Sequence, residues 1–527
     1  MSTARVLTAI FFSGLLFFSP KMGHSATYYV SPTGNDTNAG TSLQAPWQSL
    51  AKVNEFKFTP GDIILFQRGG EWHESLKASM SGTVPAPITY DAYGEGPKPH
   101  FWGSDLLINK QFEPAGDKKY SYKLATQADA ALINHVFVTC SWNGGVLTIT
   151  SDTDPRTDGK VYTACVRGNS IFSNAKNHLV FKNLIVDETA GQLNKGEVQG
   201  YGVRIEGSTN VTMEDCEANR CGRHNFGVIN TTGFVGRRLN AEFAHPNTPG
   251  GNTFYVSYAD GGAPNPQCTS QYIDCTASHL EDGKGGQYPF FVSHGEKLGE
   301  ILFQNVKANG KISVMSAPCR VVGGTLYGNG SFENFGAKVL IDGLTLKDSA
   351  AIDQYGSDGI IQNCIVNLTP TGGGPTGYGS AIVFRDKAAR NTVRFNTFVS
   401  GSFSPLAITW KNSATNWYGN IVAGKRSINF TAGAPTASDL AFADFNFYAA
   451  DTDFGGKNIE AWKSQGFDKN ALSGDPQFEN AGAGNFALKA TSNAKDAGKV
   501  TAEQKPEKDF AGTPRPLPCS LGALQGK

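Results

Sequence analysis

The stretches Ile301-Leu-Phe-Gln-Asn-Val306, Val339-Leu-Ile-Asp-Gly-Leu344 and Ile360-Ile-Gln-Asn-Cys364 share one pattern, and that pattern decides the fold. Apolar and polar residues alternate with the period of two that is typical of a β-strand. A small or amide residue then precedes an apolar residue that we expect to point inward. Taking that inward residue as the anchor, related units fall at Cys216, Leu239, Cys275, Val306, Thr325, Leu344, Cys364, Thr397 and Ile421.

The spacing of these anchors indicates a solenoid. The three intervals between Val306 and Cys364 are short and nearly equal, and the other intervals exceed them by varying amounts. Coils that carry loop insertions on one side produce such a series. A β-propeller would need an even spacing of about 40 to 50 residues, and β-sandwiches favour antiparallel hairpins. We therefore predict an all-β fold, a right-handed parallel β-helix.

The two ends of the solenoid need caps, because an open sheet edge invites association. Trp47, Leu50, Val53 and Phe56 are three residues apart, which predicts an N-terminal capping helix. We expect the capped β-helix to span residues 26–431, with the first irregular coils at 84–165. Residues 432–527 lose the tight repeat and are expected to form an irregular C-terminal cap of the same domain.

Composition excludes several classes of function. The 527 residues include 62 glycines, and only 17% are charged, where roughly 25% is typical. Lysine and arginine number 46, as do aspartate and glutamate, so the formal net charge is zero. A chain without a basic excess lacks the electrostatic character of a protein that binds nucleic acid or anionic membranes. We expect no nucleic-acid partner, no membrane association of the mature chain, and a monomer.

Residues 1–25 predict an export signal. Arg5 supplies a positive start, the apolar stretch from Leu7 to Phe18 is too short to span a bilayer, and Gly23-His24-Ser25 fits a cleavage site. We expect secretion, extracellular or periplasmic, with a membrane anchor as the alternative. Export permits disulfides between the nine cysteines, but their spacing specifies no pairing.

Both ends of the chain carry recognisable motifs. They are Tyr28-Tyr-Val-Ser-Pro-Thr-Gly-Asn-Asp36 and Pro60-Gly-Asp-Ile-Ile-Leu-Phe-Gln-Arg-Gly-Gly-Glu-Trp72 near the start, and Gly474-Asp-Pro-Gln-Phe478 and Asp509-Phe-Ala-Gly-Thr-Pro-Arg-Pro516 near the end. With the repeats between them, they resemble bacterial secreted right-handed β-helix proteins of the pectate-lyase-like superfamily. The resemblance implies the fold and a carbohydrate-active protein. It does not choose among lyases, glycoside hydrolases, uronan epimerases and noncatalytic members.

A second strand follows each anchor strand, and we expect these second strands to stack in one sheet whose outward and trailing residues line a groove. Aromatic rings and ionisable groups in such a groove suit an extended glycan. A solvated outer face would also be charged, but tryptophan and tyrosine among the charges favour a binding surface. The residues assigned to substrate binding are Asn230, Asp260, Glu296, Asp353, Tyr355, Asp386, Trp410 and Lys411.

The longest insertions lie between the anchors Cys216 and Val306 and contain four of the nine histidines, which favours a catalytic site there. We expect β-elimination on an acidic, uronic-acid-containing polysaccharide. That reaction needs a cation for the uronate, a base for the C5 proton and an acid for the leaving oxygen. The candidates are Arg223 or Arg385 as the cation, helped by calcium if a metal is used, His224 or His294 as the base, and Tyr258 or Lys284 as the acid.

Two alternatives stay open. Glycoside hydrolysis would use two carboxylates from Asp260, Glu296, Asp353 and Asp386. A noncatalytic β-helix would only bind the glycan. No histidine spacing demands a metal, so no metal ligand is assigned.

Overall fold

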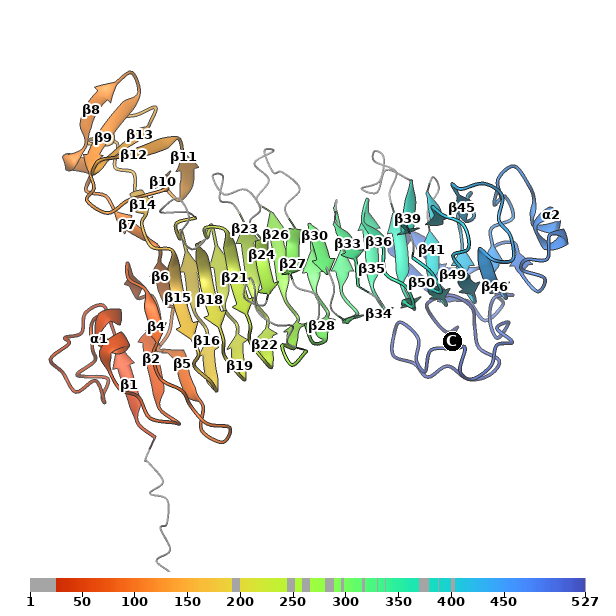
Figure 1. The fold of residues 1–527 in the computed structure, drawn as a ribbon, viewed down its shortest axis with the longest axis horizontal. Helices are drawn as coiled ribbons and strands as arrows, with labels where there is room; N and C mark the ends of the chain where they lie inside the picture. The colour runs from red at the N-terminus through yellow and green to blue at the C-terminus, as the bar shows by residue number, and fades with distance from the viewer. Residues whose placement is uncertain are drawn as a thin grey trace, which may run out of the picture.

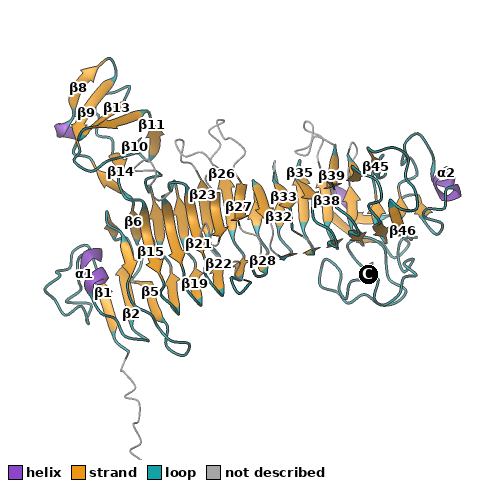
Figure 2. Ribbon diagram, in the orientation of Figure 1, coloured by secondary structure: helices purple, strands orange, loops and turns teal. Residues whose placement is uncertain are grey.

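The computed structural model has the predicted architecture, a parallel β-helix in which each coil adds one strand to each of three long sheets (Figure 1). Almost every regular element is a strand (Figure 2). The structure describes residues 25–191, 200–243, 252–257, 266–279, 289–294, 298–314, 318–328, 330–336, 338–368, 379–386, 388–399 and 403–526.

The three sheets are called A, B and C. Sheet A contains β1 (Thr27–Val30), β2 (Ile63–Gln67), β5 (Ile88–Tyr93), β16 (Leu179–Lys182), β19 (Val211–Glu214), β22 (Phe234–Arg237), β25 (Ser270–Ile273), β28 (Ile301–Gln304), β31 (Cys319–Val322), β34 (Val339–Asp342), β37 (Ile360–Gln362), β40 (Thr392–Arg394), β43 (Thr415–Tyr418) and β46 (Leu440–Asp444). Sheet B contains β3 (Glu71–Trp72), β6 (His100–Trp102), β17 (Ile185–Asp187), β20 (Glu217–Asn219), β23 (Asn240–Phe243), β26 (Thr276–His279), β29 (Lys307–Ala308), β32 (Thr325–Leu326), β35 (Thr345–Asp348), β38 (Ile365–Leu368), β41 (Thr397–Val399), β44 (Ile421–Val422), β47 (Phe447–Tyr448) and β48 (Leu472–Ser473). Sheet C contains β4 (Leu76–Ala78), β15 (Asn169–Asn174), β18 (Tyr201–Glu206), β21 (His224–Ile229), β24 (Asn252–Ser257), β27 (Pro289–His294), β30 (Lys311–Val314), β33 (Ser331–Asn334), β36 (Ala351–Gln354), β39 (Ser380–Phe384), β42 (Ser404–Ile408) and β45 (Asn429–Phe430).

A two-residue turn joins sheet A to sheet B in coil after coil. Its first residue has a positive φ of 48° to 76°, and this residue is Asn183, Asp215, Arg238, Asp274, Asn305, Gly323, Gly343, Asn363, Phe395, Gly419 or Phe445. Asparagine, aspartate and glycine occupy most of these positions because they tolerate the left-handed conformation. The next residue points inward, as the repeat predicted.

Three of the predicted anchors are wrong by one residue. Thr325, Thr397 and Ile421 begin the sheet B strands, and the inward positions belong to the residues before them, Gly324, Asn396 and Asn420. An inward asparagine does not fit a pattern that assumes apolar anchors. It is tolerated here because its amide finds partners.

The inward asparagines form a hydrogen-bonded ladder. Asn420 Oδ1 accepts from the main-chain N and from Nδ2 of Asn396, both at 3.0 Å. Asn446 Oδ1 accepts from N and Nδ2 of Asn420 at 2.9 and 3.1 Å. Asp468 Oδ1 ends the ladder by accepting from Asn446 Nδ2 at 2.6 Å. Each polar group of the ladder is thereby satisfied by the coil beside it.

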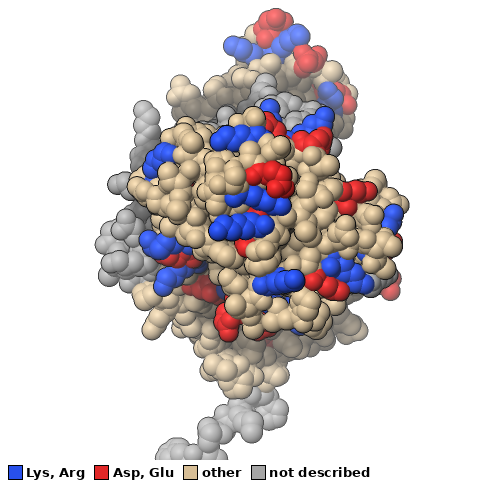
Figure 3. Space-filling model, turned by 90° about the vertical axis from the view of Figure 1, so that its right-hand side faces the viewer, with Lys and Arg blue, Asp and Glu red and all other residues tan. Residues whose placement is uncertain are grey.

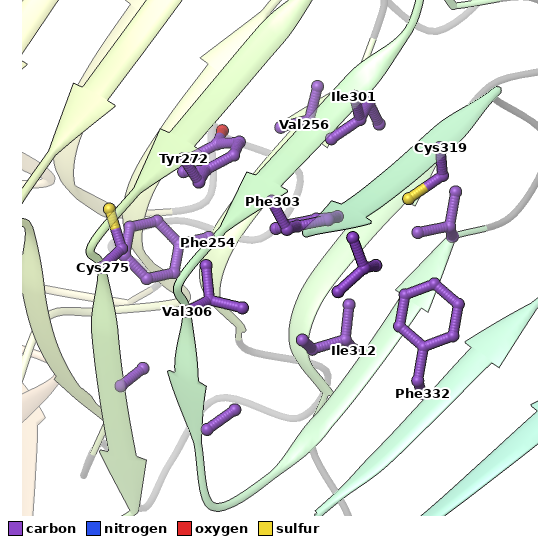
Figure 4. Close-up of a cluster of buried hydrophobic side chains, with 14 of the residues drawn as sticks. Phe254, Val256, Tyr272, Cys275, Ile301, Phe303, Val306, Ile312, Cys319 and Phe332 are labelled. Carbon is purple, nitrogen blue, oxygen red and sulfur yellow. The ribbon is translucent and has the colours of Figure 1, made fainter. Parts of the chain in front are cut away.

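Apolar side chains fill the rest of the interior in rows that follow the strand register. On sheet C, Phe226 lies in register with Phe254, and their rings stack at 5.2 Å. Farther along, Ile312 lies in register with Phe332. Figure 4 shows part of this core, where side chains from sheets A and C and from the turns between sheets A and B meet, among them Phe254, Tyr272, Cys275, Phe303, Val306 and Phe332. One continuous core therefore runs through the coils.

A helix covers the N-terminal end, as predicted. It is α1 (Leu50–Glu55), capped by Ser49, whose Oγ accepts from Lys52 N at 3.0 Å. Val53 faces the core. Trp47 is also fully buried, but it precedes the helix because the Ser49 cap sets the first turn.

The expectation of irregular coils at 84–165 is wrong for most of that range. β5 and β6 are regular coil strands, and the chain then leaves the solenoid to form antiparallel sheets that rise beside its N-terminal end (Figure 1). These sheets contain β7 (Ser104–Leu106), β8 (Glu113–Gly116), β9 (Lys119–Lys123), β10 (Ala130–Ile133), β11 (Val136–Val138), β12 (Cys140–Asn143), β13 (Val146–Thr150) and β14 (Tyr162–Cys165), with a 3-10 turn, η1 (Asn109–Gln111). The fully buried Glu188, just after β17, accepts from Ser104 Oγ and Thr163 Oγ1 and so ties this inserted module to the helix.

At the other end, sheet C stops at β45, close to the expected boundary at residue 431, while sheets A and B continue to β46 and β48. Beyond them lie α2 (Ile459–Ser464), β49 (Phe478–Asn480), η2 (Ala481–Ala483) and β50 (Asn485–Leu488). The buried Arg515 returns to the solenoid, where Nη2 donates to Asn363 Oδ1 at 2.8 Å. The closing segment is thereby fastened to a coil that lies far earlier in the chain.

The export signal predicted at residues 1–25 lies, except for Ser25, outside the described residues. All nine cysteines lie within the described ranges as free thiols, eight of them buried. In the part of the chain that the structure describes, no helix has both the length and the apolar character needed to cross a membrane.

The asparagine ladder makes a stability prediction. Asn420→Ala removes the acceptor for Asn396 and two donated hydrogen bonds, so the free energy of unfolding should fall by about 3 kcal/mol. Denaturant unfolding measures this change. Asn416→Ala is the matched control, because Asn416 is half-buried and makes one side-chain hydrogen bond, and it should cost about 0.5 kcal/mol. An equal fall in the free energy of unfolding for the two variants would contradict the view that the asparagine ladder stabilises the fold.

Candidate active site

Two carboxyl groups lie side by side on the outer face of sheet C. Glu333 of β33 is in parallel register with Asp353 of β36. Their neighbours Phe332 and Ile352 are fully buried in the core, so by the alternation of a strand the two acids face outward. Neighbouring strands lie about 4.8 Å apart. The stacking of two short coils thus brings together acids that are far apart along the chain.

Two cations flank the two acids, so the charges along the row run positive, negative, negative, positive. Lys311 Nζ of β30 lies 2.5 Å from Glu333 Oε1. Arg385, just beyond β39, donates from Nε and Nη2 to the two oxygens of Asp353 at 3.0 and 3.1 Å. The Asp353 side chain is 6% exposed and that of Glu333 15%. The row therefore lies in a sheltered strip of the surface.

The surroundings of Asp353 affect its protonation. Burial raises the pKa of Asp353 above its ordinary value. The hydrogen bonds from Arg385 act in the opposite direction, and the nearby charge of Glu333 adds to the rise. The net direction is upward, so Asp353 keeps its proton to a higher pH than a surface aspartate does.

An open hollow of about 620 Å³ adjoins the row and is lined by Tyr355, Asp386, Thr409 and Trp410. These residues follow the ends of β36, β39 and β42. The Tyr355 ring stacks on Phe335 at 4.4 Å, and the Arg385 guanidinium lies 5.8 Å from the Tyr355 ring centre. Arg385 therefore connects the carboxyl row with the hollow, because it binds Asp353 and lies near the Tyr355 ring.

The second strands predicted from the sequence do stack in one sheet. β21, β24, β27, β30, β36, β39 and β42 follow one another in sheet C, with β33 inserted between β30 and β36. Tyr355, Asp386 and Trp410 meet at the hollow, and Asp353 lies beside it. Lys411 points to the C-terminal side, where its Nζ donates to the main-chain oxygen of Ala434 at 2.7 Å.

Glu333 was missed by the sequence reasoning, although a signal was present. Gly330-Ser-Phe-Glu-Asn-Phe335 aligns with Ala350-Ala-Ile-Asp-Gln-Tyr355, and the interval between the two stretches matches the shortest spacing of the repeat. That alignment places Glu333 at the position of Asp353. Without it, the coil that contains β33 contributed no residue to the predicted groove.

Among the candidate combinations, Arg385 as the cation with His224 or His294 as the base does not fit the structure. β21 and β39 are six strand spacings apart in sheet C, so the two residues are separated by roughly 29 Å. From β27, which His294 ends, the separation from β39 is roughly 19 Å. Arg385 therefore cannot neutralise a uronate whose C5 proton goes to either histidine. The variable insertions hid the number of coils between them.

The remaining predicted residues occupy several places. His224 is fully buried beside Tyr201, with the ring centres 4.9 Å apart, so it does not reach the surface as a base must. Arg223 precedes it and is half-buried. Asn230 is exposed after β21. The predicted acids and binding residues Tyr258, Asp260, Lys284 and Glu296 lie outside the described residues, as does the side chain of His294.

Calcium has no evident site in the described ranges. Within them, no three or more histidine, cysteine, aspartate or glutamate side chains gather in an arrangement that could hold a metal ion. The acids of sheet C are engaged by Lys311 and Arg385. No chemical step is therefore derived through calcium.

Comparison with known proteins supports the fold. No family model matches the chain. A stretch of 74 residues, 13% of the chain, is 46% identical to lacto-N-biosidase of Bifidobacterium longum subsp. longum, and 65 residues, 12% of the chain, are 42% identical to the uncharacterized protein YwoF of Bacillus subtilis strain 168. These stretches make up only 5% and 13% of the two relatives.

Among solved structures, XylC in complex with xylose is similar with a TM-score of 0.52 and 10% identity, over 95% of this chain and 99% of that one. GH136 lacto-N-biosidase from Eubacterium ramulus has a TM-score of 0.37 and 14% identity, over 85% and 68%. Pectate lyase Pel9A has a TM-score of 0.40 and 13% identity, over 95% and 97%. At these identities the likeness to XylC shows the fold alone, which places the chain among the parallel β-helix proteins.

The Arg385–Asp353 pair should behave as a sheltered ion pair. In Arg385→Met the pKa of Asp353 should rise further, because the hydrogen bonds that lower it are lost. The free energy of unfolding at neutral pH should fall by about 3 kcal/mol, since a sheltered carboxylate loses its partner. Carboxyl NMR titration, assigned with Asp353→Asn, and denaturant unfolding measure the two effects.

The control is Arg390→Met, because Arg390 binds Asp358 with the same sequence separation of 32 but on an exposed part of the surface. Arg390→Met should lower the free energy of unfolding by at most about 1 kcal/mol. A larger fall in the free energy of unfolding for Arg390→Met than for Arg385→Met would contradict the view that burial makes the Arg385–Asp353 ion pair the more stabilising of the two.

Proposed function

We propose that the protein is a carbohydrate-degrading enzyme, a glycoside hydrolase that uses Glu333 and Asp353. The observation that carries the proposal is the register that sets two outward carboxyls on strands about 4.8 Å apart. Retaining glycosidases hold their two carboxyls about 5 to 5.5 Å apart. The hollow beside the pair, with its aromatic lining, offers a place for a sugar ring.

The roles follow from the environments of the two acids. Asp353 has the raised pKa and serves as the general acid, which protonates the leaving oxygen. Arg385 then stabilises the carboxylate that remains. Glu333, held by Lys311, attacks the anomeric carbon and forms a glycosyl-enzyme. Asp353 finally takes a proton from the water that hydrolyses this intermediate.

Two relatives support a carbohydrate substrate. The named enzyme among the sequence relatives is a lacto-N-biosidase, and the XylC structure with the similar fold was determined with xylose. The matched part of the lacto-N-biosidase is a small share of that protein. Its substrate is therefore not transferred to this chain, and the proposal rests on the geometry of sheet C.

β-Elimination of a uronan is the second candidate. Its support is a different cluster on the N-terminal half of sheet C, where the guanidinium of Arg204 lies 5.2 Å from the ring centre of Tyr201, which in turn lies beside His224. A cation, a phenol and an imidazole are the groups that elimination needs. Glu206, however, already binds Arg204 at 2.7 Å, and His224 is buried.

The two reactions leave different products. With a panel of neutral and uronic oligosaccharides, hydrolysis should release reducing ends without ultraviolet-absorbing unsaturated sugars, and NMR of the first product should show a retained anomeric configuration. Glu333→Gln and Asp353→Asn should each lower kcat about 10³-fold or more. Asp358→Asn, which changes an exposed acid outside the row, should leave kcat unchanged.

Unsaturated product from the unmodified chain would favour elimination instead. Full activity in both Glu333→Gln and Asp353→Asn would overturn the assignment of the carboxyl pair.

We also propose that the chain acts after export, as a monomer on an extracellular or periplasmic polysaccharide. The n-region, short apolar stretch and small-x-small site of residues 1–25 support export. Expression with the native N-terminus should yield a mature protein outside the cytoplasm whose first residue is Ala26. Amino-terminal sequencing checks this, and an intact Met1 on a membrane-bound chain would contradict it.

A further inference from the structure

The cations around the hollow are already engaged. Lys311 pairs with Glu333 at 2.5 Å and Arg385 holds Asp353 through two hydrogen bonds. Lys411 donates to a main-chain oxygen and lies 3.8 Å from Asp439. In the described surroundings of the hollow, each of these positive groups is therefore committed to an acceptor of the protein.

Asp386 is the exception among the charged groups. Its carboxylate lines the hollow, and no described lysine or arginine lies within 4.0 Å of it. The residue has a φ of 46°, which sets it in the sharp turn after β39. A carboxylate can only accept hydrogen bonds, and its two oxygens suit two adjacent hydroxyls. The uncompensated charge in the hollow is thus negative.

Two further groups complete the lining. The Nε1 atom of Trp410 is buried and has no hydrogen-bond partner among the described residues, so Trp410 lines the hollow with its ring and not with this donor. The Thr409 hydroxyl donates to the main-chain oxygen of Phe384 at 3.0 Å and can still accept. Tyr355, backed by Phe335, supplies an aromatic ring. The lining therefore offers acceptors for hydroxyls and two aromatic rings.

Figure 3 shows that basic and acidic side chains are mixed over the C-terminal end of the molecule. At the hollow itself, the described ion pairs decide which charges are left for a ligand. A sugar carboxylate placed there would meet Asp386, which has no lysine or arginine of the described ranges within 4.0 Å, and like charges in contact repel strongly. Neutral hydroxyls meet no such penalty.

We propose that the hollow at Tyr355, Asp386, Thr409 and Trp410 is a subsite for a neutral sugar residue and that it rejects a uronate. Asp386 accepts hydrogen bonds from two hydroxyls of the sugar, and the rings of Tyr355 and Trp410 contact the sugar. This inference deepens the proposed function and rests on it for the view that a glycan is bound here. It sets the substrate class of the site as a neutral glycan, in contrast to the uronan expected from the sequence.

Binding tests the inference separately from catalysis. Glu333→Gln in the otherwise unchanged mature chain is titrated calorimetrically with neutral xylo- and galacto-oligosaccharides and with oligogalacturonates of equal length. The neutral series should contain a ligand that binds at least 10-fold more tightly than its uronic counterpart. Adding Asp386→Asn should lower the affinity for that ligand about 10-fold, and adding Trp410→Phe should also lower it. Adding Asp358→Asn, on an exposed surface away from the hollow, should change nothing.

The outcomes separate the two claims. Equal or tighter binding of the uronic series, no binding by either series, or neutral binding that Asp386→Asn leaves unchanged would each overturn the neutral subsite. Neutral binding lost in Asp386→Asn, together with no hydrolysis by the unmodified chain, would support the subsite while refuting the proposed hydrolase. Adding Asp386→Lys should raise affinity for oligogalacturonate, which a purely structural role of Asp386 would not produce.

Discussion

The left-handed residue at each turn from sheet A to sheet B is the constraint on which the rest of the structure depends. It lets the chain change direction within two residues, so that consecutive coils can lie directly over one another. The residue after it enters the core, and in the C-terminal coils that residue is an asparagine held by the next coil. Register is thus maintained by backbone geometry and by the interior hydrogen bonds together.

The candidate site is a direct product of this register. Glu333 and Asp353 are neighbours because they belong to consecutive short coils that carry an acid at the same position, and Arg385 reaches Asp353 from the coil beyond. Burial alone would favour a neutral Asp353, whereas Arg385 favours the charged form. An acid held between these two tendencies can both give and recover a proton. The hollow next to it adds aromatic and acidic groups, through which we propose that a sugar ring is recognised.

Much of this arrangement could be predicted from the sequence, because periodicity is a local property. The three-sheet solenoid, the stacking of the second strands and the meeting of Tyr355, Asp386 and Trp410 all follow from strand patterns and their spacing. Three other features were not foreseen. The distance from His224 to Arg385 depends on how many coils separate the two residues, and the inward Asn396 and Asn420 depend on hydrogen bonding inside the core. The antiparallel module at 104–165 depends on how the inserted strands pair with one another. Glu333 could be predicted from the sequence, but only by aligning the two short coils with each other.

The central claim is that two acids brought together by coil stacking act as one catalytic pair, with Glu333 as the nucleophile. The most direct measurement is peptide mapping by mass spectrometry after reaction with an activated 2-fluoro glycoside of a sugar that the enzyme hydrolyses, which traps the glycosyl-enzyme. The account predicts a single label on the peptide that contains Glu333, and no label there in Glu333→Gln. A label on a different carboxylate, or turnover of the natural glycan with no covalent intermediate, would contradict it.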